Sequence, residues 1–152
     1  LKFRRNSILM DLALEEAKKA KNLGEVPVGA VIVKDGQVIA TAHNLKENLK
    51  NPLAHAEILA INEACKKLDN WRLSGCELYV TLEPCPMCAG AILQSRISRV
   101  HIGTLDDTTG AGGSIINILQ NANLPYFVDL VWYHDKRCSD ILINFFKSKR
   151  LK

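Results

Sequence analysis

LYVTLEPCPMCAGAI, which spans residues 78–92, is the stretch of sequence that decides the fold. Residues 77–82 are mostly apolar and β-branched, which predicts a short strand. Residues 86–95 are predicted to form a helix, because proline is tolerated in the first turn of a helix. Cys85 and Cys88 therefore lie where a strand gives way to a helix.

Further predicted elements lie on both sides of this unit. Residues 28–33 and 37–42 are expected to form a hairpin, because Asp35-Gly36 between them is a strong turn signal. The remaining predictions are helices over residues 6–22, 54–68 and 139–149, strands over residues 97–102 and 126–131, and a glycine-rich loop over residues 103–114.

This order of elements predicts an α/β fold, since a helix and a hairpin are followed by strands that alternate with helices. We expect a three-layer α/β/α arrangement around a five-stranded mixed sheet. The sheet cannot be all parallel, because its first two strands form a hairpin. A length of 152 residues fits one domain, so we expect residues 1–152 to form a single domain.

Composition excludes several classes of protein. Hydrophobic residues make up 47% and charged residues 24%, an ordinary globular mixture that excludes collagen-like and disordered chains. The sequence has no apolar run of the roughly 18–20 residues that a membrane helix needs. The N-terminal segment lacks the features of a secretion signal, because acidic residues soon interrupt its apolar positions. We therefore expect a cytoplasmic protein without a membrane partner.

The cysteine count points away from disulfides. The chain has five cysteines, and an odd number in a cytoplasmic protein argues against a disulfide framework. The cysteines are therefore expected to be buried thiols or metal ligands.

The formal net charge is +4, which permits an anionic partner without requiring one. Basic residues gather at the two ends, which indicates either solvated termini or a surface that contacts phosphate. These residues are Lys2, Arg4 and Arg5 at one end, and Lys136, Arg137, Lys147, Lys149, Arg150 and Lys152 at the other.

Two segments carry metal-binding residue types. In the first turn of a helix, Cys85 and Cys88 can place both sulfurs on one metal, and the positive end of the helix favours thiolates. With His55 they would fill three positions of a tetrahedral zinc site, leaving the fourth for water as catalytic sites do. The alternatives are a redox cysteine pair, or a closed structural site. A fourth ligand could come from Cys65, Cys76, Cys138, His43, His101 or His134, although each is more simply a buried thiol or an ordinary imidazole.

Glu57, two residues after His55, is predicted to be a proton shuttle. Two thiolates already balance the charge of Zn²⁺, so a carboxylate would add little as a ligand, whereas bound water needs a group to accept its proton. Residues two apart do not share a helix face, so His55 must lie at the irregular entry to the helix. The alternative is a first-turn carboxylate that favours the helix dipole.

The pattern H-x-E followed by P-C-x-x-C resembles the signature of zinc nucleobase deaminases, in the cytidine and deoxycytidylate deaminase superfamily. The chain also resembles bacterial tRNA-specific adenosine deaminases along nearly its whole length. The matching stretches are EVPVGAVIV (25–33), HN (43–44), NPLAHAEILAI (51–61), LYVTLEPCPMCAGAI (78–92), SRISRVHIG (95–103), TGAGGS (109–114) and ILINFFKSKR (141–150).

This resemblance implies a cytidine-deaminase-like fold and hydrolytic deamination of the wobble adenosine of a tRNA anticodon to inosine. It implies that zinc, one ion per subunit, is held by His55, Cys85 and Cys88, that the zinc-bound hydroxide attacks the base, and that Glu57 shuttles protons. The partners would be a tRNA anticodon stem-loop and a second copy of the chain, in a homodimer.

The resemblance also implies contacts with the substrate. Asn44 would hydrogen-bond the flipped base, Val28 and Ala56 would line its pocket, and Asp106 would lie in a loop that contacts the neighbouring nucleotide. Simpler alternatives are a strand-end turn for Asn44, loop solvation for Asp106, and loop flexibility for the glycines of residues 109–114.

One segment departs from the family pattern. Relatives often carry a basic residue in the loop around residues 105–108, which here reads LDDT. The resemblance therefore does not decide whether this loop contacts RNA. Arg96 and Arg99 either contact phosphate or cap a helix end.

Three rival functions remain. Residues 55–67 and 83–92 also resemble guanine deaminases that act on the free base, and a cytosine- or cytidine-type deaminase is a weaker rival. The rival of another class is a non-catalytic zinc-containing RNA-binding subunit, for which a fourth protein ligand on zinc would be evidence.

Overall fold

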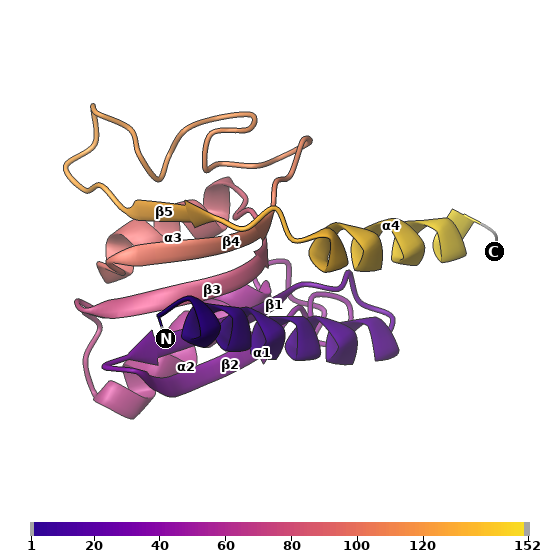
Figure 1. Ribbon diagram of the computed structural model, residues 1–152, viewed down its shortest axis with the longest axis horizontal. Coiled ribbons are helices and arrows are strands. Elements are labelled where there is room, and N and C mark those ends of the chain that lie inside the picture. The colour runs from indigo at the N-terminus through magenta and orange to yellow at the C-terminus, as the bar shows by residue number, and fades with distance from the viewer. Residues whose placement is uncertain (1, 151–152) are drawn as a thin grey trace.

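Figure 1 shows the computed structural model, which describes residues 2–150. Lys152 lies outside the described residues, as do the side chains of Lys2 and Arg4. The elements in chain order are α1 (Lys2–Asn22), β1 (Gly29–Lys34), β2 (Gln37–His43), α2 (Ala56–Leu68), β3 (Cys76–Leu82), α3 (Pro86–Ser95), β4 (Arg99–Thr104), β5 (Asp129–Trp132) and α4 (Lys136–Arg150).

The strands form one five-stranded sheet in the order β2-β1-β3-β4-β5. Strand β1 pairs antiparallel with β2 and with β3, whereas β3, β4 and β5 are parallel. The predicted mixed sheet is therefore confirmed, with the hairpin at one edge and the parallel strands at the other.

Helices cover both faces of the sheet. Side chains alternate along each strand, so Val31 of β1 and Tyr79 of β3 pack in one apolar cluster with α1 and α4. Ile32 and Leu78 point the other way and pack in the larger cluster with α2 and α3. Figure 1 shows α1 in front of the sheet and α2 and α3 behind it. The three-layer α/β/α prediction is thus confirmed.

Gly29 permits the close packing of α1 against β1. A Cβ atom at Gly29 would lie 1.9 Å from the carbonyl oxygen of Ala13 and 2.6 Å from the amide nitrogen of Ala17. Both atoms belong to the backbone of α1, which cannot move aside locally. A residue without a side chain is therefore required where this helix crosses the strand.

The predicted boundaries differ from the structure at several ends. The largest shift of a single end is at α1, which begins at Lys2 and not at residue 6, and strand β5, predicted over residues 126–131, spans Asp129–Trp132. The amide of Val128 donates to the carbonyl of Leu119, and its carbonyl accepts from the side chain of Gln120. These groups are bonded to the preceding loop, so they do not extend the ladder with β4.

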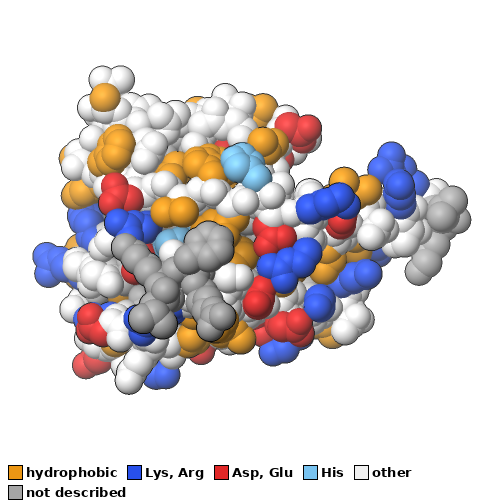
Figure 2. All heavy atoms as spheres, in the orientation of Figure 1, with side chains coloured by type: hydrophobic (Ala, Val, Ile, Leu, Met, Phe, Trp, Pro, Cys, Tyr) orange, Lys and Arg blue, Asp and Glu red, His pale blue; other side chains and the backbone are white. Residues whose placement is uncertain are grey.

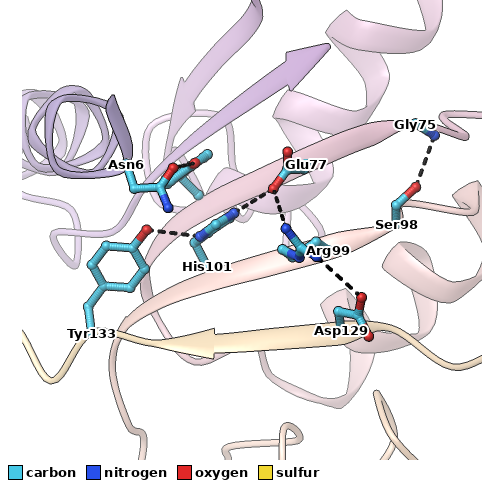
Figure 3. A network of polar contacts seen from close by, with 9 residues as sticks. Asn6, Gly75, Glu77, Ser98, Arg99, His101, Asp129 and Tyr133 are labelled. Atoms are coloured by element: carbon cyan, nitrogen blue, oxygen red, sulfur yellow. Dashed lines mark hydrogen bonds and ion pairs between the residues drawn. The ribbon is translucent and has the colours of Figure 1, made fainter. Parts of the chain in front are cut away.

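A polar network joins α1 to strands β3, β4 and β5 (Figure 3). The buried His101 lies between Glu77, at 2.7 Å from Nε2, and the Tyr133 hydroxyl, at 2.9 Å from Nδ1. Arg99 lies 3.7 Å from Glu77 and 3.6 Å from Asp129. The guanidinium of Arg99 thus faces two carboxylates, which argues against a phosphate contact there.

Within residues 2–150, no helix is both long and apolar enough to cross a bilayer.

Candidate metal centre and active site

The three predicted metal ligands lie at the starts of two helices. His55 is the N-cap residue of α2, with an extended backbone at φ −77° and ψ 154°. Cys85 is the N-cap residue of α3, Pro86 follows it, and Cys88 lies in the first turn. Both helices pack on the same face of the sheet, so both present their positive ends to this point.

The donor atoms converge. Nδ1 of His55 lies 3.6 Å from Sγ of Cys85 and 3.5 Å from Sγ of Cys88. The ligand atoms of the three residues all lie within 4.8 Å of one another. Zinc bonds of about 2.3 Å to sulfur and about 2.0 Å to nitrogen, at a tetrahedral angle, place sulfur and nitrogen about 3.5 Å apart. The spacing and the donor types therefore fit one zinc ion.

The electrostatics of the cluster favour a thiolate. The pKa of Cys85 is lowered to about 4, chiefly by a hydrogen bond with Cys88 and also by one with His55, against the effect of burial. The pKa of Cys88 is raised because Cys88 shares that hydrogen bond and is buried. The pKa of His55 is raised, chiefly by its hydrogen bond with Cys85. The cluster therefore holds protons that metal binding would release.

Among residues 2–150, no fourth His, Cys, Asp or Glu side chain joins this group. His43 contacts Glu16 of α1 through Nδ1 at 3.1 Å, and His101 belongs to the network of Figure 3. Cys138 lies in α4, on the other face of the sheet. Three protein donors are typical of a catalytic zinc site, whereas structural sites usually have four.

Glu57 lies beside the cluster, in the first turn of α2. Its side chain is 4% exposed, and burial raises its pKa to about 7. The extended backbone of His55 confirms the irregular helix entry that residues two apart require. The role of Glu57 as a proton shuttle stays a prediction.

One cavity of about 780 Å³ brings the predicted site residues together. Its volume is in the range of small-molecule sites in proteins. The predicted residues in its wall are Val28, Asn44, His55, Ala56, Glu57, Cys85 and Asp106. Cys88 is fully buried behind this wall.

Asn44 makes the contacts of a turn residue and also faces the cavity. Its Nδ2 donates to the carbonyl of Val26 at 3.2 Å, and its Oδ1 accepts from the amide of Lys46 at 3.1 Å. An amide has a second N–H and a second lone pair. The turn contacts therefore leave room for the predicted hydrogen bond to a base, which stays a prediction.

Asp106 holds its own loop. Its carboxylate accepts hydrogen bonds from the amides and hydroxyls of Thr108 and Thr109. Burial raises the pKa of Asp106, but these hydrogen bonds outweigh burial and lower it overall. The carboxylate of Asp106 therefore stabilises the turn of its own loop, and its contact with a nucleotide stays a prediction.

Arg96 caps the end of helix α3. Helix capping was one of the two roles predicted for it, the other being a phosphate contact. Its Nη1 donates to the carbonyls of Leu93 and Gln94, each at 2.9 Å, at the end of α3. Its guanidinium also lies 3.6 Å from the ring centroid of Tyr126. This end of α3 is opposite to the end that carries Cys85.

Several wall residues had no role in the sequence predictions. Glu25 and Glu83 are buried carboxylates, although both occur in the stretches that carry the resemblance. In the sequence, each of these glutamates is marked only by a nearby proline, in EVP for Glu25 and in EP for Glu83. A nearby proline does not predict that a side chain is buried. Other wall residues without a predicted role include Lys46 from a loop and Phe145 and Phe146 from α4.

The C-terminal helix places basic groups beside the cavity. Helix α4 projects beyond the sheet in Figure 1, and Figure 2 shows basic side chains over this part of the molecule. Lys147, Lys149 and Arg150 occupy its last turn. At its first turn, by contrast, Lys136 pairs with Asp140 and Arg137 pairs with Asp11 and Asp135. Among the described residues, the basic side chains at the start of α4 therefore form ion pairs, whereas those of its last turn form none with another described side chain.

Comparison with known families agrees with this geometry. The model of the cytidine and deoxycytidylate deaminase zinc-binding region matches residues 4–104, which include all three donors and Glu57. The chain belongs to this deaminase family. Together with the three-donor cluster, this assigns one zinc ion to each subunit of the deaminase.

Relatives and solved structures narrow the comparison within the family. The deaminase is 47% identical to a tRNA-specific adenosine deaminase of Bacillus subtilis, over 97% of this chain and 92% of the relative. A structure from studies of A-to-I editing by tRNA:A34 deaminases superposes with a TM-score of 0.86 at 42% identity, covering 90% of this chain and 99% of that one. The resemblance to tRNA-specific adenosine deaminases and the cytidine-deaminase-like fold are thereby confirmed.

One guanine deaminase structure is similar to a smaller part of the chain. The structure of a guanine deaminase from Bacillus subtilis has a TM-score of 0.62 at 42% identity, covering 65% of this chain and 64% of that one. At the same identity, this match covers less of each chain than the match to the structure from the studies of tRNA:A34 deaminases.

Proposed function

We propose that the protein is a tRNA adenosine deaminase that converts the wobble adenosine of an anticodon to inosine. The observation that carries the proposal is the cavity that has His55, Cys85 and Glu57 in its wall, in a chain that matches tRNA-specific adenosine deaminases over nearly its whole length. A three-donor zinc site with an adjacent buried carboxylate is the arrangement that hydrolytic deamination of a nucleobase needs.

The residues of the cavity divide the chemical work. Zinc, when bound by His55, Cys85 and Cys88, would make a water molecule acidic enough to act as the nucleophile near neutral pH. Glu57 would take a proton from the attacking water and deliver protons to the ring nitrogen and to the departing amine. The oxygen of water thus replaces the amine at the ring carbon, and ammonia leaves.

The apolar part of the cavity would receive the base. An adenine in an anticodon loop can be splayed out of the stack, and single-stranded loops are where proteins read RNA sequence. Val28 and Ala56 are both buried in the cavity wall and would contact the faces of the adenine base. Asn44 would form hydrogen bonds with the edge of the adenine base, because an amide group both donates and accepts hydrogen bonds.

Basic residues near the cavity would contact the phosphates of the anticodon arm. Lys46 and Lys149 lie in the cavity wall, and Lys147 and Arg150 lie in the same turn of α4 as Lys149. Two cations in the cavity wall, with two more in the last turn of α4, favour a polyanion over a neutral free base. A tRNA substrate also agrees with the predicted cytoplasmic location.

We also propose that the protein is a homodimer. Large apolar side chains stay exposed in the described monomer, including Leu53, Trp71, Ile115, Ile116 and Phe127. Exposed apolar surface of this kind often marks a contact between subunits. Sedimentation equilibrium of the zinc-loaded protein should give twice the chain mass, and a monomer at micromolar concentration would contradict the proposal.

The decisive experiment is incubation of the zinc-loaded protein with an anticodon stem-loop RNA that carries adenosine at the wobble position. The expected product is inosine at that position and at no other adenosine of the loop. A parallel incubation with free guanine tests the guanine deaminase rival, which predicts xanthine. Formation of neither product by a zinc-loaded protein would favour the non-catalytic RNA-binding subunit.

A further inference from the structure

Glu83 lies between the metal-binding turn and the loop that forms one side of the cavity. It directly follows β3, precedes Cys85 by two residues, and is 2% exposed. Its Oε1 accepts from the amide of Asp106 at 3.0 Å and from the hydroxyl of Ser114. Its Oε2 accepts from the amides of Gly112 at 2.8 Å and Ser114 at 3.1 Å. One carboxylate therefore gathers four donors from residues 106–114.

The loop is shaped around this carboxylate. A Cβ atom at Gly110 would lie 2.5 Å from Cδ of Glu83 and 2.4 Å from the carbonyl oxygen of Asp106. Gly110 therefore gives the carboxylate room, so loop flexibility is the wrong explanation for this glycine. Two backbone hydrogen bonds add to the contact, from Glu83 to Thr104 at 2.9 Å and from Ala111 to Pro84 at 2.8 Å.

The rest of the loop is weakly held by apolar packing. Ala111 and Leu119 are buried, but Leu105, Ile115 and Ile116 are 47%, 57% and 49% exposed. Within one chain, apolar packing therefore contributes little to the position of this loop. The hydrogen bonds of Glu83 thus supply the main polar anchor of residues 106–114.

We propose that Glu83 is a positioning residue for the RNA substrate, which holds residues 106–114 at a fixed place relative to the metal ligand Cys85. Asp106 and Thr109, at the near end of this loop, belong to the cavity wall. This inference rests on the proposed tRNA deaminase function. In this inference Glu83 fixes the position of the cavity wall and takes no part in proton transfer.

A carboxylate suits this position better than an amide. Both oxygens of Glu83 accept two hydrogen bonds each, whereas a glutamine side chain has one oxygen and places an N–H₂ group in the position of the other. Glu83→Gln keeps the size of the side chain and sets that N–H₂ group against two donors. The variant should therefore release the loop without removing the metal.

The test compares steady-state kinetics of Glu83→Gln and the wild type on the anticodon stem-loop RNA. We expect KM to rise about tenfold while kcat changes less than about threefold, because buried donors that lose an acceptor move the loop. Zinc content should be unchanged. Glu16→Gln is the matched control, since Glu16 is another buried carboxylate but lies outside the cavity wall, and its KM should equal that of the wild type.

Two milder variants change the loop residues that contact the carboxylate of Glu83. Ser114→Ala removes one donor, and Gly110→Ala places a methyl group against the Glu83 carboxylate. Both should raise KM, with the smaller rise for Ser114→Ala. They also keep the proposal testable if Glu83→Gln does not fold.

A second readout needs no turnover. Fluorescence anisotropy should show weaker binding of the stem-loop RNA to Glu57→Ala/Glu83→Gln than to Glu57→Ala. A wild-type KM with a reduced fraction of active protein would mean that Glu83 has only a structural role and would overturn the inference. Failure of the wild type to form inosine would instead overturn the proposed function.

Discussion

At the scale of single residues, we predict that turnover depends on Glu57. Glu57→Ala should keep zinc and the fold but lower kcat about 10²–10⁴-fold, the usual contribution of positioned proton transfer. The measurement is inosine formation by a variant whose zinc content has been determined. Glu63→Ala is the matched control, because Glu63 is an exposed glutamate of the same helix. Wild-type turnover by zinc-loaded Glu57→Ala would exclude the shuttle role.

The two cysteines make a second prediction. Cys85→Ser and Cys88→Ser should each lose most of their zinc, because a neutral hydroxyl is a much poorer zinc ligand than a thiolate. Elemental analysis of the purified variants measures the loss. Cys65→Ser should retain one zinc per chain, since Cys65 lies outside the three-donor group. Full zinc occupancy in Cys88→Ser would refute its assignment as a ligand.

The residues of the site differ in how well sequence alone predicts them. Cys85 and Cys88 were predictable because their spacing at a helix start is a local signal, and His55 was predictable because the resemblance pairs an H-x-E segment with that signal. Glu83 was not predictable, since its burial depends on donors from residues 106–114 that the fold brings back to it. Glu25 is similar, because it accepts from the amides of Glu47 and Asn48.

At the scale of elements, Glu16 fastens α1 to the edge of the sheet. It lies 2.6 Å from Lys19 within the helix and 3.1 Å from His43 at the end of β2. Burial raises the pKa of Glu16, but hydrogen bonds from Lys19 and His43 outweigh burial and lower it below 4.5 overall. A lowered pKa in the folded state means that this carboxylate stabilises the fold above the unfolded pKa, and that the contribution is lost as pH falls.

Glu16→Gln should therefore reduce the free energy of unfolding at pH 7 by about 1 kcal/mol. The difference from the wild type should shrink as pH falls through the region below 4.5, where the wild-type carboxylate becomes protonated as well. Urea denaturation at pH 7 and at pH 4 measures both values. An equal difference at the two pH values would show that the ionised state of Glu16 does not matter.

The elements themselves were predictable wherever hydrophobic periodicity decides the structure. The hairpin, α2, β3 and α3 appear close to their predicted positions, because apolar alternation and turn signals act over a few residues. Strand β5 is shorter than predicted because residues up to Val128 bond to the loop around Leu119. That competition depends on tertiary contact, so a local pattern cannot reveal it.

At the scale of the whole molecule, we predict that the basic residues in the last turn of α4 contact the RNA substrate. Activity at subsaturating stem-loop RNA should fall steeply as salt rises, because phosphate contacts release counterions. Lys149→Ala should lower the slope of log(kcat/KM) against log[salt] by about 1. Lys67→Ala is the control, since Lys67 lies in the last turn of α2, at the other end of that helix from His55. A flat salt response of the wild type would contradict the phosphate contacts.

The charge distribution along the chain did not reveal this arrangement by itself. A count of basic residues near the C-terminus could not separate Arg137, which pairs with two aspartates, from Lys149, which lies in the cavity wall. Both occur in one helix, and the difference arises from which neighbours α4 meets along its length.

The position of the metal donors at two different helix starts has a further consequence for the fate of the protein. His55 and Cys85 are 30 residues apart in sequence, so their donor atoms meet only when both helices are packed in the folded chain. An ion that binds only the folded form draws the folding equilibrium toward it. In a zinc-starved cell the enzyme would therefore be depleted by proteolysis as well as silenced, and metal supply would govern its abundance.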